Sequence, residues 1–321
     1  VVRRALEIEP LKAELHDSMA MLLAFREELD QAEQYQRKAI ELAPENPNNY
    51  TSMGHLMERQ NKLDQAIYWY IKASRIDPED PELPMQIALW LYDLDLPESG
   101  DAWAKRAIAI APHAPTARRL KLDRTIFGGD DAEIELVARE VIAGVTEDRH
   151  WVVRTAAAEL CRIHLERGTP GEAIDYLLEQ YPEAADVSRF PTGGAAPMFA
   201  QIMVQMTRAM SDPSLDRAAI AQQYEDSMDA MGLGISSDPV FQNWKYLLAG
   251  ELEAAAQTAA EGRLSEPWSM NPGILRVYQR PWYRQLMEFP DVREKLADLE
   301  RQRQQQRQAT IMVLAELEQG T

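Results

Sequence analysis

Cys161 and His164 are the residues of this sequence whose types and spacing come nearest to a chemical site. Placed three positions apart on a helix, a thiolate and an imidazole share one face and could begin a zinc site. The chain has one cysteine and five scattered histidines, and no second pair occurs at a zinc-like spacing. Both residues also lie on the apolar side of their segment. We therefore expect them in a core, and we expect no metal ligand and no cofactor.

Other patterns with chemical potential have simpler interpretations. Gly128-Gly129 and Gly193-Gly194 are not followed by the residues that complete a phosphate-binding loop, so they indicate turns. No HExxH motif and no nucleophile elbow occurs, and we expect no enzymatic activity. The methionine stripe over 198–210 is typical of core filling, with an adaptable groove left open. The run RQRQQQRQ at 301–308 indicates a solvated helix face.

The composition excludes several classes of protein. A formal net charge of −18 opposes binding to nucleic acid or to an anionic membrane. The uncharged apolar runs are shorter than the roughly 20 residues of a membrane-spanning helix. Hydrophobic residues make up 45% of the 321 residues, enough for a continuous core. We expect a cytoplasmic location, with the periplasm left open.

A short motif recurs at a fixed interval in the first third of the chain. RRALEIEP, RKAIELAP, IKASRIDP and KRAIAIAP end at prolines spaced by 34 residues, namely Pro10, Pro44, Pro78 and Pro112. Between two of these prolines, the stretch 47–80 contains two amphipathic helical patterns separated by the polar Gln60–Lys62. Such a hairpin cannot cover its own apolar faces, so copies must stack on one another. Equivalent turns are expected near Glu27–Asp30 and Asp95–Ser99.

These residues resemble the tetratricopeptide repeat family, whose pattern places an aromatic, Leu-Gly and Tyr on helix A and Ala, an aromatic, Ala and Pro on helix B. The central copy supplies Tyr50, Met53-Gly54, Met57, Ala66, Tyr70, Ala73 and Pro78. The resemblance implies an all-α, right-handed superhelix of antiparallel helix hairpins (a solenoid) that becomes degenerate towards the C-terminus.

The resemblance and the phase together predict two domains. Residues 1–148 form the repeat array, and 149–321 form a degenerate helical-repeat region with a linker near 182–196 and a C-terminal helix at 291–317. The array consists of a truncated repeat at 1–12, repeats at 13–46, 47–80 and 81–114, and a degenerate hairpin at 115–148.

The family implies a non-enzymatic scaffold that binds another polypeptide in a groove lined by the A helices. The corresponding groove positions are Asp17, Met21, Asn48, Thr51, His55, Glu58, Met85, Leu89, Tyr92, Arg119 and Asp123. Acidic residues on the rim would favour a basic, partly apolar partner, and would repel the C-terminal carboxylate that chaperone-binding relatives hold. An open alternative is that another part of the chain, the 265–321 tail above all, covers this groove.

The sequence from Arg280 to Glu300 is similar to the tails of bacterial signalling proteins that carry a winged-helix or nucleotide-cyclase domain before the array. Val1 stands in the second half of a helix B, so we expect a fragment of a longer protein. Two alternatives stay open: an arm that regulates an enzyme or selects its substrates, with the catalytic domain outside this chain, and a structural or dimerisation spacer. The oligomeric state is also open.

Overall fold

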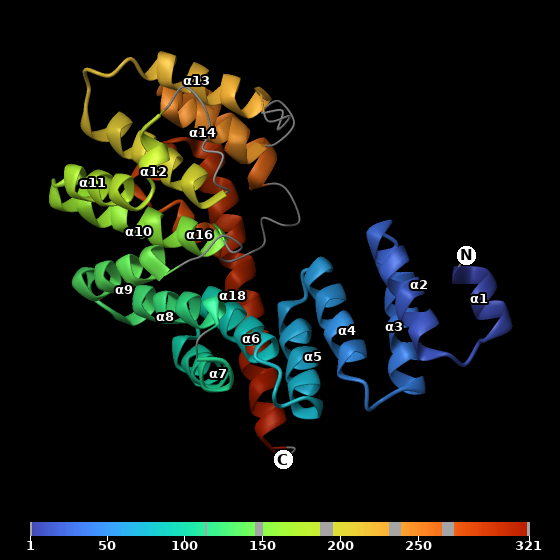
Figure 1. Ribbon diagram of the computed structural model, residues 1–321. Coiled ribbons are helices and arrows are strands. Elements are labelled where there is room, and N and C mark those ends of the chain that lie inside the picture. Colours follow the sequence, from blue (N-terminus) through green and yellow to red (C-terminus); the bar gives the residue numbers. More distant parts are fainter. Residues whose placement is uncertain are drawn as a thin grey trace. The chain divides into compact units, whose positions relative to one another are not determined.

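The computed structural model describes residues 2–112, 114–144, 150–186, 195–230, 239–264 and 273–319 (Figure 1). Within these ranges the regular structure is helical and no strand occurs, which confirms the predicted all-α class. The chain divides into two compact units. Unit 1 contains Val1–Leu120 and Arg301–Thr321, and unit 2 contains Lys121–Glu300. The domain boundary predicted at residue 148 falls inside unit 2, and the predicted division into two domains stays a prediction.

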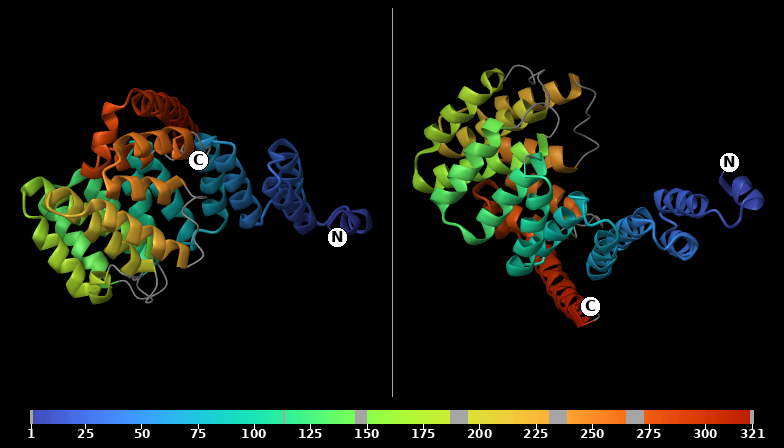
Figure 2. Two further views of the ribbon diagram at one scale, coloured as in Figure 1. Left: turned by 90° about the horizontal axis from the view of Figure 1, so that it is seen from above. Right: turned by 60° about the horizontal axis from the view of Figure 1, so that its bottom comes forward.

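Unit 1 is a row of helix pairs that follow one another in chain order (Figure 2). Its helices are α1 (Val2–Ile8), α2 (Ala13–Phe25), α3 (Leu29–Leu42), α4 (Pro47–Arg59), α5 (Leu63–Ile76), α6 (Glu82–Asp93) and α7 (Pro97–Ile110). Helices α2, α4 and α6 are the A helices, and α3, α5 and α7 are the B helices. The first two turns lie where the sequence predicts them. The third ends at Leu96, three residues before Ser99, because Pro97 suits the first position of a helix.

The turns within these three pairs share one conformation. Glu27, Asn61 and Asp95 stand 34 residues apart, and their φ angles of 62°, 55° and 60° are left-handed. The amide of the next residue donates to a carbonyl five positions back, at 2.8–3.0 Å, which is the closure that ends many helices. Gly168 and Gly250 take the left-handed position in two hairpins of unit 2. The 34-residue period is therefore a period of backbone geometry as well as of side chains.

Small residues let the two helices of a hairpin approach closely. Ala66 on α5 is fully buried, as the family pattern predicts. A Cβ added to Gly54 on α4 would lie 2.4 Å from the Tyr70 ring of α5. Gly100, which departs from the alanine of the family pattern, has a ring carbon of Tyr92 2.9 Å from the place of its missing Cβ. The α4–α5 and α6–α7 hairpins thus each pair a glycine with one large ring.

Unit 2 contains helices of more varied length around its own core. They are α9 (Asp131–Gly144), α10 (His150–Arg167), α11 (Pro170–Gln180), η1 (Pro182–Ala185), α12 (Ala195–Ser211), α13 (Arg217–Ala230), α14 (Pro239–Ala249), α15 (Leu252–Thr258), η3 (Ala259–Arg263), α16 (Gly273–Val277), α17 (Pro281–Arg284) and η5 (Gln285–Glu288). Helix α8 (Pro115–Gly128) and helix α18 (Pro290–Gln319) each have residues in both units. Met203 and Met206 are buried, as core filling requires.

The central part of the linker predicted at 182–196, residues 187–194, lies outside the described ranges. In the described part of the molecule, no helix has both the length and the apolar character needed to cross a membrane.

The end of α18 contacts unit 1 at its turns and along α5. The Gln306 amide donates to the Asn61 carbonyl at 2.6 Å and accepts from the Leu63 amide at 3.1 Å. Arg307 donates to the Asp95 carbonyl at 3.2 Å. The interpretation of 301–308 as a solvated face is therefore wrong for these two residues. Sequence alone hides the cause, because their partners lie more than 200 positions away.

Candidate functional site

The A helices of unit 1 present a mixed polar and apolar face, which we call the helix-A face. It is defined by the predicted groove residues on α2, α4 and α6. Met21, Asn48 and His55 are exposed, whereas Asp17, Thr51, Glu58 and Leu89 are half-buried. The tail helix α18 lies at the turns and along α5, on the helix-B side. These hydrogen bonds therefore do not support the alternative in which the tail covers the groove.

A connected polar group lies at the centre of the helix-A face. The Tyr70 hydroxyl lies 2.8 Å from His55 Nδ1, and Glu58 Oε2 lies 3.4 Å from the same nitrogen. Burial raises the pKa of Tyr70 well above its usual range, and the nearby Glu58 adds to this. The hydroxyl therefore keeps its proton and can donate it to Nδ1. In that arrangement the ring proton of His55 sits on Nε2, which leaves the exposed imidazole one outward-acting donor.

Glu58 also joins two successive repeats. Its Oε1 accepts from the Trp90 indole and, at 3.3 Å, from the Gln86 amide, both on α6. The Glu58 carboxylate is thus bonded to the next repeat and is not a freely solvated charge at the rim of the groove. The sequence places Glu58 at a groove position but gives no sign of Trp90 as its partner. The 34-residue phase offers a signal, since Trp90 and Gln86 stand where Leu56 and Ser52 stand one repeat earlier.

Buried amides join the first two full repeats. Gln36 on α3 donates to the Asp17 carboxylate at 3.0 Å and to the Asn49 carbonyl at 2.9 Å. Asn49 in turn donates to the Ala39 and Ala43 carbonyls, each at 3.1 Å. Asp17 is therefore held in place by the neighbouring helix. Gln36 stands where the family pattern has an aromatic, so pattern matching alone passes over it.

Three predicted groove residues do not offer a surface. Tyr92 is 2% exposed, because its ring fills the space beside Gly100 and its hydroxyl donates to Asp101 at 2.7 Å. Met85 and Asp123 are each 8% exposed. The prediction that Tyr92 and Met85 supply contact area is therefore wrong. Arg119 is half-buried on the unit 1 part of α8, and Asp123 belongs to unit 2.

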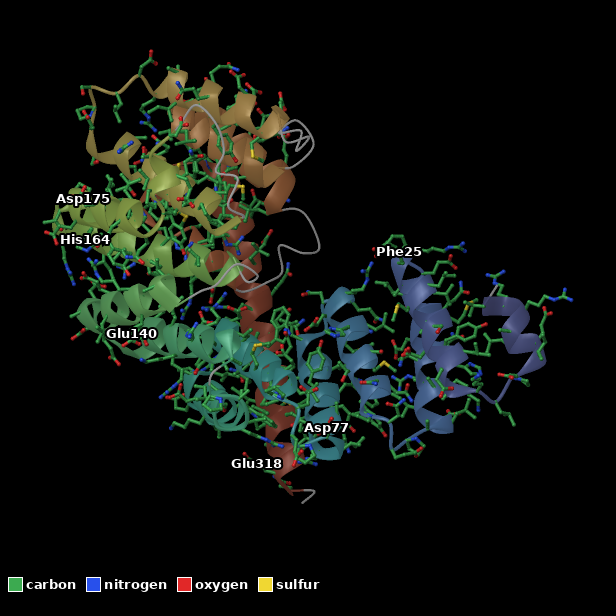
Figure 3. The ribbon with its side chains drawn as sticks, in the orientation of Figure 1. Phe25, Asp77, Glu140, His164, Asp175 and Glu318 are labelled. Atoms are coloured by element: carbon green, nitrogen blue, oxygen red, sulfur yellow. The ribbon has the colours of Figure 1, made fainter. Side chains whose placement is uncertain are left out.

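Exposed apolar side chains gather on α2 instead. Met21, Leu22 and Phe25 are 65%, 41% and 85% exposed, and Phe25 stands at the end of α2 (Figure 3). Their spacing of one and then three positions places them around one side of the helix. The apolar part of the candidate site thus lies nearer the start of the array than the sequence predicts.

Cys161 and His164 are packed in unit 2, where Figure 3 labels His164 on α10. Burial raises the pKa of the Cys161 thiol to about 12, so the reactive thiolate does not form at neutral pH. His164 bonds through Nδ1 to Thr169 at 2.9 Å and through Nε2 to Glu135 at 3.2 Å. The Thr169 hydroxyl therefore bonds to His164, and Thr169 makes no side-chain hydrogen bond that caps α11. Across the described residues, no group of three or more His, Cys, Asp or Glu is arranged to hold a metal ion.

Comparison with known families and structures agrees with this geometry. The family model of the tetratricopeptide repeat matches residues 13–46, the α2–α3 hairpin. Residues 13–46 are therefore a tetratricopeptide repeat. A tetratricopeptide repeat protein from Parabacteroides merdae has a TM-score of 0.53 and 15% identity over 77% of this chain and 89% of that chain. This likeness shows the fold.

Two further solved structures are similar over smaller parts of this repeat protein. Pseudomonas aeruginosa pilF has 18% identity and a TM-score of 0.45, covering 56% of this chain and 82% of that one. The yeast Tom70 structure has 21% identity and a TM-score of 0.44, covering 67% of this chain and 44% of that one. No curated protein sequence matches this chain. A repeat array of this kind suggests a scaffold for protein–protein interaction.

Proposed function

We propose that the helix-A face of unit 1 binds another polypeptide in an extended conformation. The observation that carries the proposal is the pairing of Asn48 and His55, both exposed and seven positions apart on α4. Seven helical residues span about 10 Å, which matches about three residues of extended chain. An amide and an imidazole so placed can bond main-chain groups of such a segment.

The site is held ready before a partner arrives. Tyr70 positions His55 at 2.8 Å, and Tyr70 itself is 1% exposed. Glu58 is held by groups from the neighbouring repeat. Because these side chains are already ordered, binding spends little free energy on arranging the receptor.

The charge and the apolar patch favour a basic, partly apolar ligand. The chain carries a net charge of −18, and Glu14 and Glu82 are exposed at the starts of α2 and α6. Met21, Leu22 and Phe25 offer apolar contact. Attraction between exposed charges is screened over about 8–10 Å at physiological salt, so association with such a ligand should slow as salt rises.

The probe for this proposal is a set of short labelled peptides that alternate Lys or Arg with Leu or Phe, beside a set with Glu in place of the basic residues. Fluorescence anisotropy with the whole chain measures affinity at low and high salt. Joint replacement Asn48→Ala and His55→Ala should weaken binding of the basic peptides about tenfold, the loss expected for about 1.4 kcal/mol.

The matched control is the pair Gln34→Ala and Lys38→Ala, which alters exposed residues on helix B of the preceding repeat. It should leave affinity unchanged, and thermal unfolding confirms that both variants are folded. Equal affinity in the Asn48/His55 variant and the wild type would show that the helix-A face is not the site. Preference for the acidic peptides would contradict the proposed ligand chemistry.

The finer proposal is that this scaffold serves as the interaction arm of a larger bacterial signalling protein. It is supported by the resemblance of 280–300 to the tails of such proteins. Determining the coding sequence upstream of Val1 tests it. A winged-helix domain there would favour transcriptional control, and a catalytic domain would favour the enzyme-linked alternative. An upstream region with neither would count against both.

A further inference from the structure

The C-terminal helix forms an interface with unit 1 that is built from helix-end groups. The Leu63 amide is one of the first four N–H groups of α5, which have no partner within their own helix. Gln306 accepts from it at 3.1 Å and donates to the carbonyl of Asn61, the left-handed residue of that turn, at 2.6 Å. One side-chain amide therefore caps the α4–α5 turn from outside the hairpin.

The next residue does the same for the next repeat. Arg307 donates to the carbonyl of Asp95 at 3.2 Å, and Asp95 is the left-handed residue of the α6–α7 turn. Asn61 and Asp95 stand 34 residues apart in the chain. Two consecutive tail residues thus bond equivalent carbonyls of two consecutive repeats. A helix that docks here recognises the repeat spacing itself.

The interface continues ten residues further along α18, at Leu317. Arg75, near the end of α5, donates to the Leu317 carbonyl at 2.9 Å, which satisfies one of the last four carbonyls of α18. A cation at a helix C-terminus also complements the helix dipole. The Leu317 side chain joins the unit 1 core at 9% exposure, and Val313 and Leu314 pack against that core. Ile311 and Met312 face outward at 38% and 65% exposure.

We propose that the surface formed by these two turns and by α5 is a helix-binding site whose ligand is the chain's own segment 301–319, bound reversibly. The features that it recognises are a Gln-Arg pair and a leucine ten residues after the arginine. The site is separate from the helix-A face and does not depend on the proposed function. Reversible binding is expected from the small apolar contribution of 301–319. Among its described residues Leu317 is the one buried apolar side chain, and Ile311 and Met312 are exposed.

The first test uses the whole wild-type chain and hydrogen exchange resolved at single amides. The Leu63 amide and the α18 amides from 309 to 317 should exchange together, faster than the α2 and α4 core amides. Exchange of all these amides at one common rate would overturn the proposal, because the tail would then open only when the array unfolds.

The second test uses a labelled synthetic peptide with the sequence of residues 299–319. A whole chain carrying Gln306→Ala and Leu317→Ala should release its own tail and take up at least about tenfold more of the wild-type peptide than the wild-type chain does, the factor that about 1.4 kcal/mol produces. Replacement of the exposed Gln308 and Met312 by Ala on the same helix is the control and should leave uptake unchanged.

A matching peptide with both Ala replacements should not bind, since it lacks the recognised groups. Slow exchange of the α2 and α3 amides verifies that the chain variant is folded. If the folded variant takes up no more wild-type peptide than the wild-type chain, the surface of the two turns and α5 does not exchange its own tail for a peptide. If the double-Ala peptide binds as well as the wild-type peptide, the recognition by Gln306 and Leu317 is refuted.

Discussion

In unit 1 two arginines that join one hairpin to the next bond to backbone carbonyls, whereas in unit 2 Arg162 bonds to three carboxylates. Arg59 reaches the Ala24 carbonyl at 2.9 Å, and Arg106 reaches the Ser74 carbonyl at 3.2 Å. In unit 2, Arg162 bonds Glu159, Asp131 and Glu166 at 2.7–2.9 Å. Both units are stacks of helices, yet these arginines bond to backbone carbonyls in unit 1 and to carboxylates in unit 2.

The difference accords with a repeat signature that persists in unit 1 and fades in unit 2. A backbone carbonyl occupies the same place in every repeat whatever the side chain, so one donor can satisfy it independently. A carboxylate–guanidinium pair requires two suitable residues at once, and each pair fixes its own local geometry. The side-chain pairs of unit 2 therefore vary from hairpin to hairpin, and so do the residues around them.

The largest effect is expected from Arg162→Met. The Arg162 side chain is 18% exposed and contacts three carboxylates, among them the nearly buried Glu159. Its removal should cost unit 2 about 3 kcal/mol, because three carboxylates, the nearly buried Glu159 among them, would each lose a cation. Arg37→Met is the matched change in unit 1, where the arginine is 53% exposed and pairs with Glu33. It should cost about 0.5 kcal/mol or less. Urea denaturation measures both, and equal losses would erase the distinction between the units.

A pH dependence should follow from Glu159. Burial alone would raise the pKa of Glu159, but Arg280 and Arg162 outweigh it and hold the pKa below its ordinary value of 4.5. The unfolded chain then takes up this proton at a higher pH than the folded chain does. The stabilisation is fully present above about pH 4.5 and is lost as the pH falls through the lower, folded-state pKa.

Urea denaturation of the wild type and of Glu159→Gln over pH 3 to 7 isolates this contribution. The free energy of unfolding should fall more steeply in acid for the wild type than for the variant. Other carboxylates, Glu135 and Glu33 among them, also have pKa values below the ordinary range and contribute to both curves. Parallel curves would mean that Glu159 does not titrate differently in the folded and unfolded chains.

The sequence predicts most of the fold because its signals are local. The four phased prolines and the alanine columns indicate the hairpins of unit 1, and Gly168 with Pro170 indicates the α10–α11 turn. The same phase places Asn48 and His55 on the helix-A face, where the structure has them exposed. Periodicity reports which side of a helix a residue takes, and that information needs no distant partner.

The features that the sequence does not predict depend on distant or unusual partners. Tyr92 holds a groove position by phase, but the missing side chain of Gly100 draws its ring inward. Gln306 reads as one of several solvated glutamines until its bonds to Asn61 and Leu63 are known. Neither contact recurs in the sequence at the 34-residue period, so periodicity cannot distinguish these residues from their neighbours.

An intermediate loss of stability is expected from a substitution at the close contact between α4 and α5 in unit 1. In Gly54→Ala the new methyl group would lie 2.4 Å from the Tyr70 ring, which is buried and cannot move aside easily. The change should cost about 1–3 kcal/mol by overpacking. Gly171→Ala in unit 2 meets no atom within 4 Å and should leave stability unchanged or raise it by up to about 1 kcal/mol. Thermal unfolding measures both, and a harmless Gly54→Ala would mean that the close approach of α4 and α5 is adjustable.

The smallest effect concerns the turns, where the two units use the same backbone with different residues. Asp95 in unit 1 has a φ of 60°, whereas Gly168 in unit 2 has a φ of 75° in the equivalent place. A left-handed conformation costs a residue with a side chain about 1 kcal/mol relative to glycine, although aspartate tolerates it better than most. Asp95→Gly removes this cost, but glycine also has more freedom in the unfolded chain, which offsets part of the gain. The net effect should be a stabilisation of unit 1 by about 0.5 kcal/mol.

Gly168→Ala should act in the opposite direction and cost unit 2 about 1 kcal/mol, because alanine brings the strain without any new contact. Asp95 contributes only its carbonyl to Arg307, so the glycine variant keeps that hydrogen bond. Urea denaturation of both variants against the wild type gives the two signs. A loss of stability in Asp95→Gly would show that the Asp95 side chain stabilises its turn by more than the left-handed backbone costs, and the two units would then close their hairpins by different means.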